Sequence, residues 1–186
     1  MPGIDHTTYI LYRYLKELVS AELLQRLSGT SGDYTLGSKI AVLDYISRTT
    51  DPLVQISIPF MQQIVERTEL CCLLTHLNHD SCIDLHHELF KDVTLLSYGR
   101  GCPRPIFVGS SPKVIISYLP KQGILDYYQR FSVELAEVNF AENEAEFLLK
   151  MKQIKKQGFY FSNGELDPNI AGLSIPIKFS SKEPPL

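Results

Sequence analysis

The hydrophobic pattern of the chain changes at Leu70, where residues 70–98 read LCCLLTHLNHDSCIDLHHELFKDVTLLSY. This stretch contains three short apolar runs, LCCLLTHL, SCIDLHHEL and VTLLSY, which are separated by His79-Asp80 and Lys91-Asp92. Short apolar runs joined by tight polar turns are typical of antiparallel strands. The stretch therefore predicts an antiparallel sheet.

Helical patterns follow this sheet. Ser110-Ser111-Pro112 predicts the start of a helix through Ser117, and Ile124 to Phe131 predicts a second, apolar helix. A third helix is expected over residues 142–156, because its acidic residues come first, its lysines come last, and Gly158 follows as a terminator. Residues 159–162 and 171–179 predict two more strands. The fold class is therefore α+β, an antiparallel sheet flanked by helices.

The segment before the sheet predicts smaller elements. Apolar residues recur at helical spacing from Thr8 to Leu24, with Asp5 as the expected N-cap, and a polar turn at residues 28–33 separates two short strands, 23–25 and 34–36. Residues 38–48 predict a connecting helix, and Asp51-Pro52 predicts a cap and first turn of another helix, with a kink at Pro59. A second domain is expected to begin at Asp51.

Bulk composition limits the class of protein. The 186 residues are 44% hydrophobic and 21% charged, as in an ordinary globular domain with a small appendage. No apolar run is long enough to cross a bilayer and no secretory signal precedes the first helix, so a cytoplasmic protein without membrane contact is expected. The net charge of −3 argues against a surface that coats nucleic acid, so any DNA contact would be local.

Six short motifs occur in order along nearly the whole chain. They are Tyr34-Thr35-Leu36-Gly37, Pro59 with Ile64 and Glu66-Arg67-Thr68, Pro105-Ile106 with Lys113 and Leu119-Pro120, Gly158-Phe159-Tyr160, Glu165-Leu166-Asp167-Pro168, and Ser174-Ile175-Pro176-Ile177. Each motif alone is weak, because glycine and proline mostly mark turns, but their common order and separations are specific. In this order and spacing the chain resembles the IclR family of bacterial transcription regulators.

The resemblance implies a domain organisation and a function. Residues 1–37 would form the recognition helix and wing of a partial winged helix-turn-helix, residues 38–50 a linker helix, and residues 51–186 a GAF-like effector-binding domain. The implied function is DNA-binding transcription regulation, of the repressor type. The expected partners are DNA, a small carboxylate or carbon-source metabolite, and further copies of the chain in a dimer or tetramer.

The resemblance also implies an effector site. Helix N-termini attract anions, and the positions that correspond to the family's carboxylate-binding turn are Ser110 and Ser111, for which a plain helix cap is the alternative. Ser162 and Gly172 stand where the family has an acidic residue and a cysteine. Arg104 occupies a wall position and would either pair with a carboxylate or extend into solvent, the latter being the favoured interpretation. The remaining wall positions, which would be core residues with or without a ligand, are Val93 and Leu96.

DNA contacts are expected on the first helix. Five residues lie in its exposed N-terminal half, and a solvated face is the alternative interpretation of Tyr12 and Arg13. Only four residues precede Asp5, so the two preceding helices of a winged helix-turn-helix are expected to be missing and DNA binding to be weak or lost. A further strand of the family pattern is likewise expected to be missing after Ile177, which would leave an exposed sheet edge. The five residues are Thr7, Thr8, Tyr9, Tyr12 and Arg13.

Two other classes of function remain as alternatives. A thiol nucleophile or a zinc site would use the cysteines and histidines, but adjacent residues of a strand point to opposite faces, so neither Cys71-Cys72 nor His86-His87 supplies two ligands from one face. Neither an enzyme nor a metal or cofactor is therefore expected, and the four cysteines should be free thiols. The second alternative is a truncated paralogue that dimerises with a full-length regulator or has no remaining role. The residues considered for the first alternative are Cys71, Cys72, Cys82, Cys102, His76, His79, His86 and His87.

Overall fold

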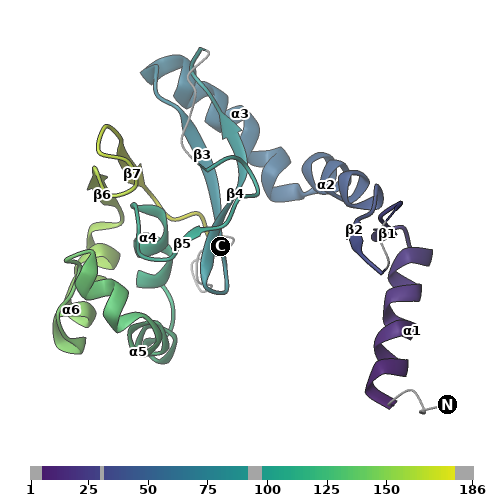
Figure 1. Ribbon diagram of the computed structural model, residues 1–186. Helices are drawn as coiled ribbons and strands as arrows, with labels where there is room; N and C mark the ends of the chain where they lie inside the picture. Colours follow the sequence, from purple (N-terminus) through teal and green to yellow (C-terminus); the bar gives the residue numbers. More distant parts are fainter. Residues whose placement is uncertain (1–5, 30–31, 92–97, 179–186) are drawn as a thin grey trace. The chain divides into compact units, whose positions relative to one another are not determined.

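The computed structural model describes residues 6–29, 32–91 and 98–178. The chain separates into two compact units, Met1–Ile58 and Pro59–Leu186, which are described separately (Figure 1). The boundary falls inside helix α3 (Pro52–Thr68), which is continuous. The division at residues 37 and 50 expected from the sequence stays a prediction.

The first unit contains a helix, a small hairpin and a second helix. These are α1 (His6–Ser20), β1 (Leu24–Arg26), β2 (Tyr34–Leu36) and α2 (Lys39–Thr50), and β1 pairs antiparallel with β2. The hairpin prediction is confirmed. The prediction that the first helix reaches Leu24 is wrong, because the chain turns at Glu22, where φ is +60°, and Leu24 already pairs with Leu36.

Helix α3 begins with the expected cap. The Asp51 carboxylate accepts hydrogen bonds from the Leu53 N–H at 2.8 Å and the Val54 N–H at 3.2 Å, which satisfies two of the donors that a helix start leaves unpaired. Pro52 is the first helical residue, where a missing N–H costs nothing. The helix continues past Pro59 to Thr68, and Met61 and Val65 of its second half are buried.

The main sheet of the second unit has the strand order β3 (Cys72–Asn78), β4 (Ser81–Glu88), β5 (Arg104–Pro105), and all pairs are antiparallel. The turn at His79-Asp80 lies where the sequence predicted it. The register shifts between Leu74 and Thr75, which places Thr75 opposite Asp84. Apart from Tyr98, the third predicted run, residues 93–98, lies outside the described residues.

A second, two-stranded sheet is formed by β6 (Tyr160–Asn163) and β7 (Ala171–Ser174), with Ser162 opposite Gly172. Strand β7 ends five residues before the expected residue 179. Pro176 has no N–H to donate to a sheet ladder, which explains why the strand stops before it.

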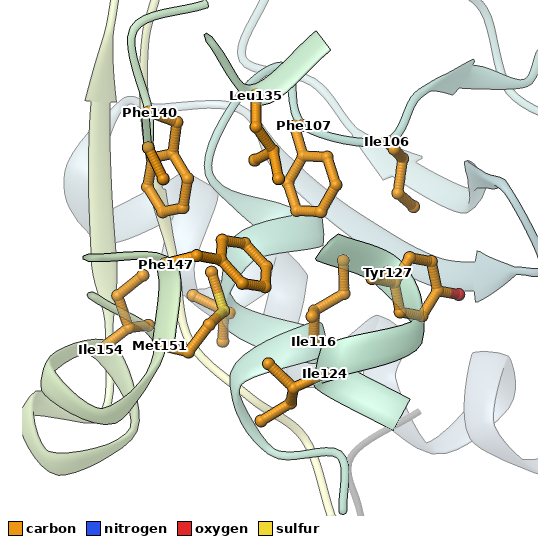
Figure 2. Packing of buried hydrophobic residues seen from close by; sticks show 12 residues of the cluster. Ile106, Phe107, Ile116, Ile124, Tyr127, Leu135, Phe140, Phe147, Met151 and Ile154 are labelled. Atoms are coloured by element: carbon orange, nitrogen blue, oxygen red, sulfur yellow. The ribbon is translucent and has the colours of Figure 1, made fainter. Parts of the chain in front are cut away.

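Three helices and the loops between them enclose the core. They are α4 (Ser111–Ser117), α5 (Lys121–Glu137) and α6 (Glu144–Gln157). Phe107 lies within the cluster, in edge-to-face contact with Phe131 and Phe147, and Met151 and Ile154 of α6 face the same cluster (Figure 2). Helix α5 has a non-helical residue at Phe131, the predicted end, but continues to Glu137.

Helix α6 ends at Gly158 as the sequence predicts, and it begins at Glu144, two residues after the predicted start. The Asn143 side chain accepts a hydrogen bond from the Glu146 N–H at 3.0 Å, and acidic residues occupy the first turn. Gly158 ends the helix in the left-handed region, with φ of +81°, where a residue without a Cβ is unstrained.

Candidate functional site

Four serines from three elements gather where the start of α4 meets the β6–β7 hairpin, and we call them the serine cluster: Ser110, Ser111, Ser162 and Ser174. The Ser174 Oγ lies 2.6 Å from the Ser110 Oγ and 3.1 Å from the Ser111 Oγ. The Ser162 hydroxyl donates to the Gly172 carbonyl at 3.4 Å. One hydroxyl of the hairpin thus links the two serines at the start of α4.

Strand register and a glycine make this approach possible. Residues 160, 162, 172 and 174 lie on one face of the hairpin, because side chains alternate along a strand and Ser162 pairs with Gly172. A Cβ at Gly172 would lie 3.0 Å from the Ser110 Oγ and 3.3 Å from the Ser162 Oγ. The absence of a side chain at residue 172 therefore leaves room for the hydroxyls of α4.

A carboxylate of the protein lies beside the serine cluster. Glu165 Oε2 accepts a hydrogen bond from the Gly109 N–H at 3.0 Å and forms an ion pair with Lys113. Lys113 is buried, and its ammonium lies 4.7 Å from the ring centroid of Phe140. Burial lowers the pKa of Lys113, while Glu165 acts in the opposite direction. The Gly109 N–H is thus already used, so an incoming anion would have to bind through other groups.

Arg104 lies in a buried network with Thr75, Asp84 and His87, which we call the Arg104–Asp84 network. The guanidinium donates to the Asp84 carboxylate and, at 3.1 Å, to the Thr75 hydroxyl. Thr75 also donates to Asp84 at 2.7 Å, and His87 Nε2 lies 3.1 Å from Asp84 Oδ2. Among the described residues, the Arg104 Nε has no hydrogen-bond partner.

The interpretation of Arg104 as a solvent-reaching side chain is wrong. It is only 6% exposed, and its partner Asp84 is 1% exposed. The sheet register explains this, because β5 pairs Arg104 with Cys82, and Asp84 is two residues from Cys82 on the same face of β4. A buried carboxylate therefore holds the arginine inside.

Residues 45–184 match the family described as bacterial transcriptional regulator IclR, C-terminal. The chain belongs to the IclR family. Its α+β architecture is that of IclR effector-binding domains. No curated protein matches the chain significantly.

Solved structures of IclR proteins share the fold at low sequence identity. An IclR family regulator from Brucella abortus is 15% identical with a TM-score of 0.71, over 95% of this chain and 68% of that one. The IclR of Thermotoga maritima is 16% identical with a TM-score of 0.66, over 91% and 68% of the two chains. An IclR homologue from Microbacterium hydrocarbonoxydans, crystallised with 4-hydroxybenzoate, is 14% identical with a TM-score of 0.62, over 92% and 70%.

The structure brings together part of the effector site expected from the IclR resemblance. Ser110, Ser111, Ser162 and Gly172 converge, whereas Arg104 donates hydrogen bonds to Thr75 and Asp84. Val93 and Leu96 lie outside the described residues. Sequence reasoning missed Ser174, although its place two residues after Gly172 on a predicted strand signals the same face.

Glu165 and Asp84 were also missed as parts of these two groups. Glu165 was named only as part of an IclR motif, and Asp84 was not singled out within the apolar run SCIDLHHEL. A carboxyl group within a buried strand is itself a signal, because buried charges are nearly always paired.

The residues expected to contact DNA all lie on α1. Thr7, Tyr9, Tyr12 and Arg13 are exposed, with Tyr9 at 62% and Tyr12 at 59%, and Thr8 is half-buried. Their role stays a prediction.

The cysteines are free thiols, two of them in strands. Burial raises the pKa of Cys82 to about 12, and burial together with Glu88 raises the pKa of Cys72. Both therefore stay protonated near neutral pH, whereas a nucleophile or metal ligand needs the thiolate. In residues 6–29, 32–91 and 98–178, no three histidine, cysteine or acidic side chains are placed to share a metal ion.

None of the helices in the described ranges combines the length and the apolar character that a membrane-spanning segment needs.

Proposed function

We propose that this IclR-family chain senses a small organic acid in the cytoplasm and that the serine cluster binds the acid's carboxylate. The observation that carries the proposal is the convergence of Ser110 and Ser111 of α4 with Ser162, Gly172 and Ser174 of the hairpin. Hydroxyls can donate to a carboxylate, and hydrogen bonds to charged acceptors are stronger than those between neutral groups.

The arrangement suits a ligand that replaces the hydrogen bonds of Ser174 to Ser110 and Ser111 with hydrogen bonds to its own carboxylate. Its hydroxyl is shared between Ser110 and Ser111, so a carboxylate entering between them would receive hydrogen bonds that the serines now make to one another. The Microbacterium homologue with bound 4-hydroxybenzoate supports an acid of this size as the ligand class. We place Arg104 in the surrounding wall, as the IclR resemblance implies.

Thermal shift with a panel of small carboxylates, including 4-hydroxybenzoate, tests the proposal. A ligand at about 100 times its dissociation constant should add roughly 2.7 kcal/mol of stability. Replacing Ser174→Ala should then weaken the best ligand about 10- to 100-fold in calorimetry, since it removes a hydroxyl available to a charged group.

Matched variants sharpen this test. Ser132→Ala removes a hydroxyl from α5, away from the cluster, and should leave affinity unchanged. Gly172→Ala should weaken binding, because its Cβ would displace the Ser110 and Ser162 hydroxyls, whose side-chain ends can move without unfolding the domain. If no carboxylate stabilises the protein, or if Ser174→Ala binds as tightly as the original chain, the proposal is wrong.

We further propose that α1 contributes to DNA contact in a repressor-type regulator, through Thr7, Thr8, Tyr9, Tyr12 and Arg13. The exposure of Tyr9, Tyr12 and Arg13 supports this. One basic residue among the five offers little phosphate neutralisation, so the expected affinity is weak and changes little with salt concentration. A gel shift at low salt measures it, and nanomolar, sequence-specific binding would contradict the expected weakness.

A second candidate function is assembly with another IclR-type chain, the same or a full-length paralogue. Helix α2 has no buried residue, and Leu43, Tyr45 and Ile46 are 46%, 61% and 45% exposed. Exposed apolar stripes of this kind mark interaction surfaces. Light scattering after gel filtration, with a pull-down against intact IclR regulators, tests it. A monomer that captures none of them would exclude this role.

A further inference from the structure

A hollow of about 470 Å³ lies where the end of α4, the start of α5 and one face of α6 meet. Its walls include Ile124 of α5 and Leu148 and Met151 of α6. Met151 and Ile124 are 1% and 9% exposed, so the floor is continuous with the hydrophobic core. The hollow is open to solvent on one side, so a bound molecule would be buried only on the side that faces this floor.

The rim of the hollow is basic. Lys121 of α5 and Lys152 and Lys155 of α6 line it, and all three side chains are exposed. Within the part of the chain that the structure describes, none of the three forms an ion pair, whereas Lys113 and Lys150 both do. The negative end of α4 and the positive end of α5 both meet this hollow, so their dipoles offset one another and the lysines set its charge.

We infer that this hollow binds a free amphiphilic carboxylate, an apolar chain ending in one carboxyl group. The chain would lie on Ile124, Leu148 and Met151, and the carboxylate would pair with Lys152 and Lys155, one turn apart on α6. The rim and the floor match the two ends of such a molecule, and a cationic amphiphile of the same length would be repelled.

This site is distinct from the serine cluster. Ser110 and Ser111 are at the N-terminal end of α4, and Ser117, which lines the hollow, is at its C-terminal end. At about 1.5 Å rise per residue the two ends are roughly 9 Å apart along the helix. The inference therefore does not depend on the proposed role of the serine cluster.

Calorimetry on the whole chain tests the inference, with octanoate as the probe. Hexanoate has two CH2 groups fewer than octanoate, and each buried CH2 changes the affinity about two- to fourfold at an open site. Hexanoate should therefore bind about 4- to 15-fold more weakly. Octylammonium, which has the same tail and the opposite charge, should show no binding.

The double variant Lys152→Gln and Lys155→Gln should weaken the binding of octanoate about 5- to 10-fold, as expected for the loss of two exposed ion contacts. The matched control Lys156→Gln, on the same helix but outside the hollow, should leave the affinity unchanged. Ser174→Ala should also leave it unchanged, which separates this site from the serine cluster.

Three results would overturn the inference. One is equal binding of octanoate and octylammonium, and another is equal weakening by Lys156→Gln and by the double variant. The third is binding to phosphatidylglycerol vesicles without binding of free octanoate, which would assign the lysines to a membrane surface instead.

Discussion

Replacing Asp84 with alanine is expected to destabilise the second unit by about 3–5 kcal/mol, the cost of removing one partner from a buried ion pair. The magnitude follows from the position of Asp84, which is 1% exposed and holds the 6% exposed Arg104. Without the carboxylate, the guanidinium keeps its charge but has neither water nor an anion to solvate it. Thr75 also loses the acceptor of its 2.7 Å hydrogen bond.

Urea unfolding followed by circular dichroism measures this loss. A destabilisation of this size corresponds to a decrease in Tm on the order of 6–20 °C for a chain of this length. Asp80→Ala is the matched control, because Asp80 is on the same hairpin and forms an exposed ion pair with Arg130, with side-chain exposures of 56% and 48%. That variant should cost less than about 1 kcal/mol.

A double variant separates charge from packing. Asp84→Ala combined with Arg104→Met removes both charges, so it should be more stable than Asp84→Ala alone despite the extra substitution. A loss below about 1 kcal/mol for Asp84→Ala, or a double variant less stable than the single one, would refute the account of Arg104 as a buried, Asp84-dependent cation.

Three further predictions concern pH, a second ion pair and a helix cap. Burial raises the pKa of Cys82 from 9.0 to about 12, so above about pH 9 the unfolded thiol loses its proton while the folded one keeps it. The free energy of unfolding should therefore fall as the pH rises between about 9 and 12. At pH 10 the loss should be about 1.4 kcal/mol relative to Cys82→Ala measured in parallel, and equal pH profiles of the two proteins would contradict this. Glu165→Gln should cost about 2–3 kcal/mol in urea unfolding, because it leaves buried Lys113 without its carboxylate. Adding Lys113→Met should restore part of the loss, and a Glu165→Gln variant as stable as the original chain would show that the ion pair is not needed. Asn143→Ala should cost about 1 kcal/mol by removing the α6 cap, whereas Asn163→Ala, which caps no helix, should be near neutral; equal losses would argue against the cap.

Much of the fold could be predicted from the sequence because the relevant forces act over a few residues. The turn at His79-Asp80, the Asp51 cap of α3 and the Gly158 end of α6 all depend on near neighbours. Two boundaries were wrong for different reasons. The first helix ends at Ser20 because Leu24 pairs with Leu36, which is a contact between distant residues. Strand β7 stops at Ser174 because Pro176 follows, which is a local signal that the sequence already contained.

The candidate site was only partly predictable. Ser110, Ser111, Ser162 and Gly172 were singled out through the IclR resemblance. The sequence spacing shows only that Ser174 shares a strand face with Gly172, not that this face meets Ser110 and Ser111. Arg104 was misjudged because its environment depends on Asp84, twenty residues earlier, and on the register shift at Thr75. Such a shift comes from packing across strands rather than from any local preference.

By itself, the sequence determined the order and type of most elements, the Asp51 cap, the main turns, and membership of the IclR family, but not strand β5. These depend on local backbone energetics and on motif order along the chain. Only the tertiary structure decided that Arg104 is buried against Asp84, that Glu165 takes the Gly109 N–H, and that the serines of α4 meet the β6–β7 hairpin. A charge or hydroxyl that is removed from water must form hydrogen bonds with the groups packed around it. Which groups these are depends on the distant segments that the tertiary structure brings within hydrogen-bonding range.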